Sequence, residues 1–263
     1  MYDGCEVIKL KILSRTISEK TARIVSSIEK SVHSPVSYRD ISERPNQSYQ
    51  TFGTVDTHPS DGTYKVWLSK ELPQEIFETN LLHELRHIIQ IESGYSEVYN
   101  KNTTEFNSQD RCFIQEVGAH LSSVVLDIDV DIWLECNGYS QEHFFRTNYD
   151  NLIKLCGHQY TRLSDPLNFA NLALALLHMS VHCDDELAQT LFHAYATYPK
   201  VVDIVSELRN KLRTMHIDTP ASATLAHCLV IDSFNLWGYY YVASPIIKIR
   251  TAREYRSFLA LQV

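Results

Sequence analysis

His83-Glu84-Leu85-Arg86-His87 is the stretch from which the rest of the chain is best interpreted. On a helix of 3.6 residues per turn the two histidines share one face. The apolar residues around them fall on the opposite face: Leu81, Leu82, Leu85, Ile88 and Ile89. An amphipathic helix buries its apolar side, so both imidazoles point away from that core. Two imidazoles at this spacing can bind one zinc ion, with the neighbouring glutamate as a general base.

The predicted zinc helix begins near Pro73, since proline is favoured in a first helical turn, and ends by Gly94. The alternative is a pair of histidines without a ligand role. A helix with two purely structural histidines has no reason to carry a glutamate next to them on the same side. The position of Glu84 therefore favours the zinc interpretation.

A catalytic zinc site usually has three protein ligands and one water, so a third ligand has to come from another segment. Residues 113–120 predict a second helix, whose apolar side comprises Phe113, Ile114, Val117, Leu121, Val124 and Val125. Glu116 lies outside this side and shares a face with His120, while Gly118 and Ala119 allow close packing nearby. We therefore predict Glu116 as the third ligand, with His120 as the alternative.

The pattern of His83, Glu84, His87 and a later helical Glu116 resembles the gluzincin metallopeptidases, and most closely the compact intracellular proteases of the ImmA/IrrE type. The resemblance covers roughly residues 35–135 and rests on short motifs. It implies a zincin-like catalytic half in which His83, His87 and Glu116 bind zinc and Glu84 is the general base. Those proteins often carry glycine where this chain has Arg86.

The chemistry of a zinc hydrolase asks for the same roles. Zinc lowers the pKa of its bound water to about 7, and Glu84 is placed to take the proton as that water attacks a carbonyl. A second donor normally stabilises the tetrahedral oxyanion. The sequence offers several candidates for this donor: Tyr95, Tyr99, His120, His216 and His227. His120 is equally suited to hydrogen-bond a zinc ligand and fix its orientation.

Before the zinc helix the periodicity changes from 3.6 to 2. Residues 48–58 and 63–69 alternate in polarity around the turn Ser60-Asp61-Gly62, which predicts a hairpin. Residues 36–41 predict a further strand, and residues 18–32 an amphipathic helix. We expect a small antiparallel sheet beside the zinc helix.

An edge strand beside the zinc helix binds an extended peptide in the proteases that this chain resembles. Such pairing uses main-chain hydrogen bonds and leaves the choice of sequence to side-chain pockets. The predicted substrate strand here is residues 64–69.

The remainder is predicted to be helical, over residues 141–156, 166–182, 186–198, 200–215 and 221–237, with breaks at Gly157, Pro199 and Pro220. The expected fold is therefore α+β and mostly α. We expect a zincin-like metallopeptidase domain over residues 1–139 and a helical C-terminal domain over residues 140–263, packed on it because no linker separates them.

Two further patterns have simpler interpretations. His178 and His182 are four residues apart but follow an apolar run without an adjacent glutamate, so core packing is favoured. The stretch from Asp127 to Asp131 imitates the start of a calcium loop, but Ile132 replaces the required glycine. We therefore expect no second metal and no calcium.

Composition indicates where such a protein works. Of its 263 residues 44% are hydrophobic, which is ample for a core, and a net charge of −8 at pH 7 argues against nucleic-acid binding. The six cysteines form no C-x-x-C pair, which favours reduced, buried thiols, Cys112 included. No signal region or membrane span is apparent. We expect a cytoplasmic protein, although delivery into a host cell as an effector fits the same features.

These observations predict a zinc-dependent endopeptidase that hydrolyses a peptide bond in a protein or peptide substrate. One alternative is a non-catalytic, zinc-stabilised sensor or adaptor whose helical half binds a partner. Another is a zinc amidase acting on a non-protein substrate. Glu84 favours catalysis, because a structural zinc site has no use for a general base and generally closes its fourth position.

Overall fold

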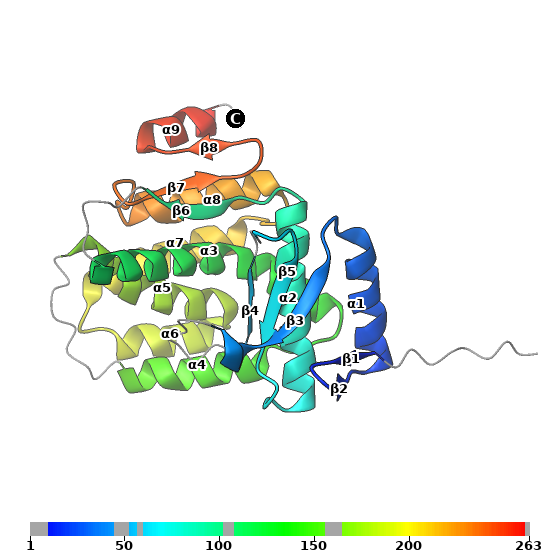
Figure 1. Ribbon diagram of the computed structural model, residues 1–263. Coiled ribbons are helices and arrows are strands. Elements are labelled where there is room, and N and C mark those ends of the chain that lie inside the picture. The colour runs from blue at the N-terminus through cyan, green and yellow to red at the C-terminus, as the bar shows by residue number, and fades with distance from the viewer. Residues whose placement is uncertain (1–9, 45–52, 57–59, 102–107, 156–164, 261–263) are drawn as a thin grey trace, which may run out of the picture. The chain divides into compact units, whose positions relative to one another are not determined.

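The computed structural model describes residues 10–44, 53–56, 60–101, 108–155 and 165–260 (Figure 1). These residues form an α+β, mostly helical fold, as predicted. The chain divides into two compact units: Met1–Ser93 with Val130–Gln141, and Gly94–Asp129 with Glu142–Val263. This division differs from the predicted single cut after residue 139, because the long helix α3 (Ser108–Cys136) contributes to both units.

The first unit contains a short hairpin, a small sheet and two long helices (Figure 1). In chain order its elements are β1 (Lys11–Ile12), β2 (Arg15–Thr16), α1 (Glu19–Ser31), β3 (Val36–Asp40), η1 (Ile41–Glu43), β4 (Gly53–Asp56), β5 (Tyr64–Leu68) and α2 (Gln74–Glu92). The Ser18 side chain caps α1 by accepting from the Thr21 amide, as serine commonly does at a helix start. Helix α2 begins directly after Pro73, and Gly94 follows it with a φ of +84°, so both predicted ends are confirmed.

The three-stranded sheet corrects two expectations. The predicted hairpin is confirmed where the structure describes it, since β4 pairs antiparallel with β5; residues 48–52 and 57–58 of its predicted first strand lie outside the described residues. On the other side of β5, β3 pairs parallel with it, so the sheet is mixed. The strand order is β3-β5-β4. Residues 64–69 were therefore wrongly predicted as an edge strand: β5 is central and hydrogen-bonded on both sides. Alternation in the sequence shows which side chains share a face, but it does not show which strands are neighbours.

Helix α2, which carries the candidate zinc ligands His83 and His87, packs in the core of the first unit. This core combines apolar residues from both helices, the sheet and the end of α3: Ala22, Val25, Ile28, Val66, Leu68, Phe77, Leu81, Leu82, Leu85, Ile88, Val130 and Leu134. Because α2 buries its leucine and isoleucine side in this cluster, its histidine side faces away from the core.

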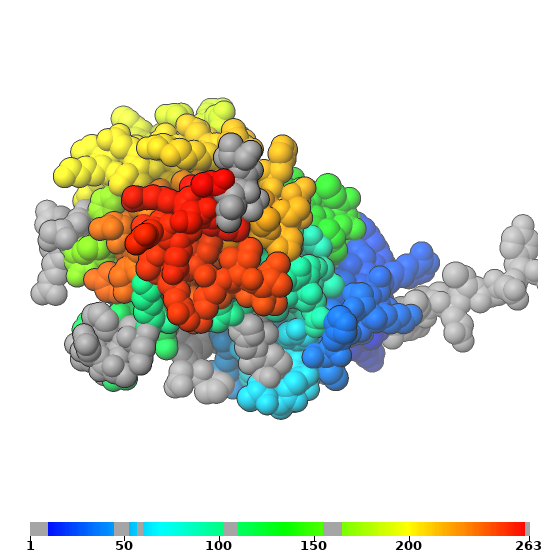
Figure 2. Space-filling view, turned by 90° about the horizontal axis from the view of Figure 1, so that it is seen from above, coloured from blue at the N-terminus to red at the C-terminus, as the bar shows by residue number. Residues whose placement is uncertain are grey.

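The second unit is built mainly from helices. Besides most of α3 it contains β6 (Glu97–Asn100), α4 (Glu142–Leu155), α5 (Pro166–His182), α6 (Asp185–Ala194), α7 (Pro199–Thr214), α8 (Pro220–Ser233), β7 (Tyr240–Ala243), β8 (Lys248–Ile249) and α9 (Ala252–Ala260). The five helices predicted after residue 140 are confirmed within a few residues. Residue 156, the predicted end of the first of them, and the predicted break at Gly157 lie outside the described residues. The sheet β6-β7-β8 was not predicted. In Figure 2 the segment from β7 to α9 forms one orange-to-red patch.

Gly118 allows a close approach inside this unit, but to strand residues and not to a helix beside the metal ligands as predicted. A Cβ there would lie 2.7 Å from Asn100 Oδ1 and 3.1 Å from the Tyr240 ring, so the glycine packs against strand residues. Among the cysteines that the structure describes, Cys183 and Cys228 are buried free thiols. Cys112 and Cys136 are exposed, which corrects the expectation that Cys112 is buried.

Over the part of the chain that the structure describes, no helix combines the length and the apolar character that crossing a membrane requires.

Candidate metal centre

Helix α2 presents His83 and His87 side by side on its polar face. Their Nε2 atoms lie 3.1 Å apart, and the ring centroids are separated by 4.8 Å with the planes at 79°. Both side chains are half-buried. Residues four apart on a helix are surface neighbours, so this proximity follows directly from the spacing in the sequence.

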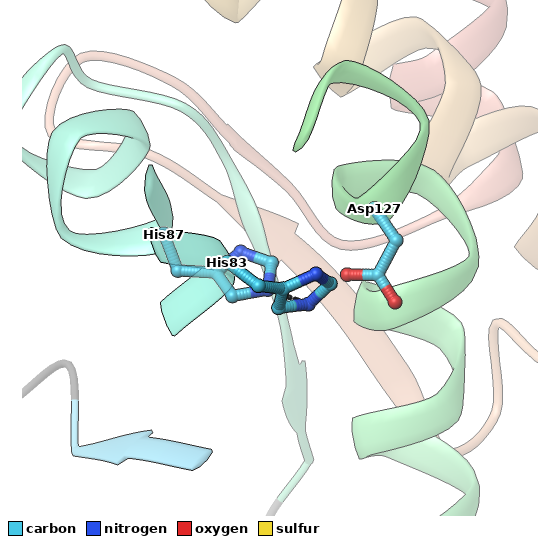
Figure 3. Close-up of side chains that lie close together, drawn as sticks. All are labelled: His83, His87 and Asp127. Carbon is cyan, nitrogen blue, oxygen red and sulfur yellow. Dashed lines mark hydrogen bonds between the residues drawn. The ribbon is translucent and has the colours of Figure 1, made fainter. Parts of the chain in front are cut away.

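A third side chain completes the group. Within the described residues, His83, His87 and Asp127 form a set that could hold a metal ion, with one ligand atom from each and all three atoms within 4.8 Å of one another. Figure 3 shows the imidazoles of α2 facing the carboxylate of α3. Asp127 lies less than one turn before Val130, which packs in the core of the first unit. The continuous helix therefore carries Asp127 alongside the histidines.

The predicted ligand Glu116 is not a member of this group. It is half-buried on α3, eleven residues before Asp127. Eleven residues are three turns, so the two carboxylates share one face of the helix but lie about 16 Å apart along its axis. One ion cannot bind both. Glu116 as a ligand stays a prediction, and Asp127 competes with it.

The signal for Asp127 in the sequence is its place between the apolar residues Leu126 and Ile128. Asp127 is 6% exposed, in a helical stretch whose neighbours Leu126 and Ile128 are also buried. A buried carboxylate is costly unless it is paired or coordinates a metal. An acidic residue on the buried part of a predicted helix is therefore a ligand candidate in its own right.

Asp127 is held by a histidine of the second unit. His178 Nε2 lies 3.1 Å from Asp127 Oδ2, and both side chains are largely buried. His178 was predicted to be a core residue, but this contact gives it a polar role. Such a partner fixes the orientation of a carboxylate and so prepares it to bind a metal.

The other ring nitrogen of each histidine, Nδ1, lies within hydrogen-bonding distance of a glutamine. His87 Nδ1 lies 2.9 Å from Gln90 Oε1, and His83 Nδ1 lies 3.0 Å from Gln141 Nε2. Gln141 also donates to Asp131 Oδ1 at 3.0 Å. Since Nδ1 of each ring is engaged by a glutamine, Nε2 is the ring atom that faces the proposed metal position in both histidines.

Glu84 is buried between α2 and the sheet. It is 6% exposed, and β4 approaches it so closely that a Cβ at Gly53 would lie 3.0 Å from Glu84 Oε1 and 3.1 Å from its Cγ. The absence of a side chain at Gly53 therefore leaves the room that the carboxylate occupies. Glu84 lies between the two histidines in the sequence and is not a member of the ligand group.

The predicted oxyanion donors all lie in the second unit. Tyr95 belongs to the hydrophobic core there, and Tyr99 donates to Glu97 while stacking on Tyr241. Burial and the Glu97 charge raise the pKa of Tyr99. Burial lowers the pKa of His120, which favours its neutral form. None of the three belongs to the ligand group, and their roles stay predictions.

The other two histidines considered as donors differ from each other. His227 is fully buried, bonds Ser96 Oγ at 3.0 Å, and has its pKa lowered to about 4 by burial, which makes it a neutral core residue. His216 is exposed.

No family model matches the chain, and no match is found among curated proteins or solved structures. The resemblance to gluzincins therefore stays a prediction, and the function has to be inferred from the residues themselves.

Proposed function

We propose that the chain is a zinc-dependent hydrolase that cleaves peptide bonds, with His83, His87 and Asp127 as metal ligands and Glu84 as general base. The observation that carries the proposal is the set of three ligand atoms within 4.8 Å of one another, with Glu84 adjacent in the sequence to the first of them. Three protein ligands of nitrogen and oxygen type match catalytic zinc sites, which keep a fourth position for water.

The spacing of the histidines fits zinc. Zinc–nitrogen bonds of about 2.0–2.1 Å in a tetrahedral site place neighbouring ligand atoms about 3.3 Å apart. The two Nε2 atoms, at 3.1 Å, already have nearly this separation. The outer partners Gln90 and His178 orient a ligand on each of the two helices, as the supporting residues of metal sites do.

Glu84 supplies the proton transfer. Bound zinc would polarise the substrate carbonyl and lower the pKa of a water molecule to about 7. The Glu84 carboxylate would accept the proton of that water and return it to the leaving nitrogen. Packing of Glu84 against Gly53 limits where the carboxylate can lie, which favours a defined geometry for this transfer.

Strand β4 replaces β5 as the proposed substrate strand. Among the described strands β4 pairs with β5 alone, and its first residue, Gly53, adjoins Glu84. An extended peptide added beside β4 would form main-chain hydrogen bonds there. This arrangement favours a peptide over a compact non-protein amide as substrate.

We expect Gly53→Ala to reduce turnover with little change in zinc affinity. The new Cβ would displace the Glu84 carboxylate, and a misplacement of 1 Å can cost about 100-fold in rate. Peptide cleavage and zinc titration would be measured on the same preparation. Gly238→Ala is the control, because a Cβ there meets nothing within 4 Å. Equal activity of the two variants would exclude Gly53 as a determinant of the Glu84 position.

The proposed function is tested by incubating the zinc-loaded full chain with a library of proteome-derived peptides and identifying products by mass spectrometry. We expect cleavage that a chelator abolishes and that the double variant His83→Ala, His87→Ala lacks. Cleavage by the double variant would show that the activity does not arise at these histidines. Stoichiometric zinc binding without cleavage of any peptide would favour the adaptor or the amidase.

A further inference from the structure

The two candidate histidine ligands have glutamine partners that present opposite groups. Gln90 presents its carbonyl oxygen to His87 Nδ1, whereas Gln141 presents its amide nitrogen to His83 Nδ1. Both glutamines are buried, at 0% and 6% exposed. Their orientation therefore affects which ring nitrogen of each histidine carries the proton.

The orientation of Gln141 is set by Asp131. A carboxylate only accepts hydrogen bonds, so the Gln141 atom 3.0 Å from Asp131 Oδ1 has to be the NH₂ group. The same nitrogen lies 3.0 Å from His83 Nδ1 and can donate its second hydrogen there. Turning the amide over would place two acceptor oxygens against each other. His83 Nδ1 is therefore an acceptor in this arrangement.

The positions of the protons on both histidines follow from this arrangement. His83 accepts at Nδ1 and carries its proton on Nε2, which lies 3.1 Å from His87 Nε2 and can donate to it. His87 carries its proton on Nδ1 and donates to Gln90 Oε1. In the series Gln141, His83, His87 and Gln90, each of the three hydrogen bonds thus has one donor and one acceptor.

A metal ion needs the lone pair of Nε2 on both rings. His87 already has it, but His83 has to transfer its proton to Nδ1, where Gln141 presents another donor. We propose that Gln141, oriented by Asp131, is a positioning residue that holds His83 in the tautomer unsuited to metal binding, whereas Gln90 holds His87 ready to bind. The inference rests on the proposed function, in which both histidines bind zinc through Nε2.

Matched methionine substitutions separate the two glutamines, because methionine keeps a similar length without donating or accepting strongly. We expect Gln90→Met to weaken Zn²⁺ binding about 10- to 100-fold, the usual cost of losing a partner that supports a ligand. We expect Gln141→Met to raise Zn²⁺ affinity, because His83 is released to adopt the tautomer that binds metal through Nε2; an unchanged affinity would contradict the inference. Competition with a chromogenic chelator, using Zn²⁺ alone and the full chain, measures both.

Long-range ¹H–¹⁵N NMR of the metal-free wild type reads the tautomers directly. We expect the Nε2-protonated form for His83 and the Nδ1-protonated form for His87, with the His83 preference lost in Gln141→Met. An Nδ1 proton on His83 in the wild type, or equal losses of Zn²⁺ affinity in the two variants, would overturn the inference. Failure of the wild type to bind Zn²⁺ would instead contradict the proposed function, and the NMR result would still decide the tautomers.

Discussion

Replacing Glu84 by glutamine is expected to leave zinc bound while turnover falls by about 10²- to 10⁴-fold, the usual contribution of general acid–base catalysis. Glutamine keeps the size of the side chain and fits the same space beside Gly53, but it cannot take a proton from water. Steady-state cleavage of a peptide identified from the library and the zinc content of the same preparation would be measured together.

A matched control is available on the same helix. Glu75 is exposed in the first turn of α2, two turns before the histidines, and Glu75→Gln makes the same chemical change there. We expect this variant to keep full turnover. If Glu84→Gln also kept the full biological output, while disruption of the helices after Gln141 abolished it, the zinc-stabilised adaptor would replace the hydrolase as the better proposal.

The second large effect concerns the third ligand. We expect Asp127→Asn to weaken zinc binding strongly, because it removes a charged ligand. Loss of a residue that only supports a ligand costs about 10- to 100-fold in metal affinity, and the loss here should be larger. Glu116→Gln, the same kind of change on the same face of α3, should leave zinc affinity unaltered. Competition with a chelator of known affinity measures both constants, and circular dichroism shows whether each variant is folded.

The reverse result would restore the ligand predicted from the sequence. Loss of zinc in Glu116→Gln with retention in Asp127→Asn would mean that the site uses the earlier turn of α3. Because three turns separate the two residues, one of them at most can join His83 and His87 around a single ion. The two variants together therefore decide between the alternatives.

Local pattern in the sequence was sufficient for much of the fold. The spacing of His83 and His87 places both rings on one face of α2, and the apolar residues around them determine which face is buried. The hairpin of β4 and β5 and the helices α4 to α8 followed in the same way, since each depends on periodicity and turn residues close together in the chain.

Contacts between distant segments were decided only in the tertiary structure. The periodicity of the sequence placed Glu116 outside the apolar side of its helix, but only the tertiary structure groups Asp127 with His83 and His87. The order β3-β5-β4 and the contact of Gln141 with His83, 58 residues earlier, are of the same kind. Periodicity reports which way a side chain points from its own element, whereas the residue it meets depends on how elements pack, and packing is a property of the whole core.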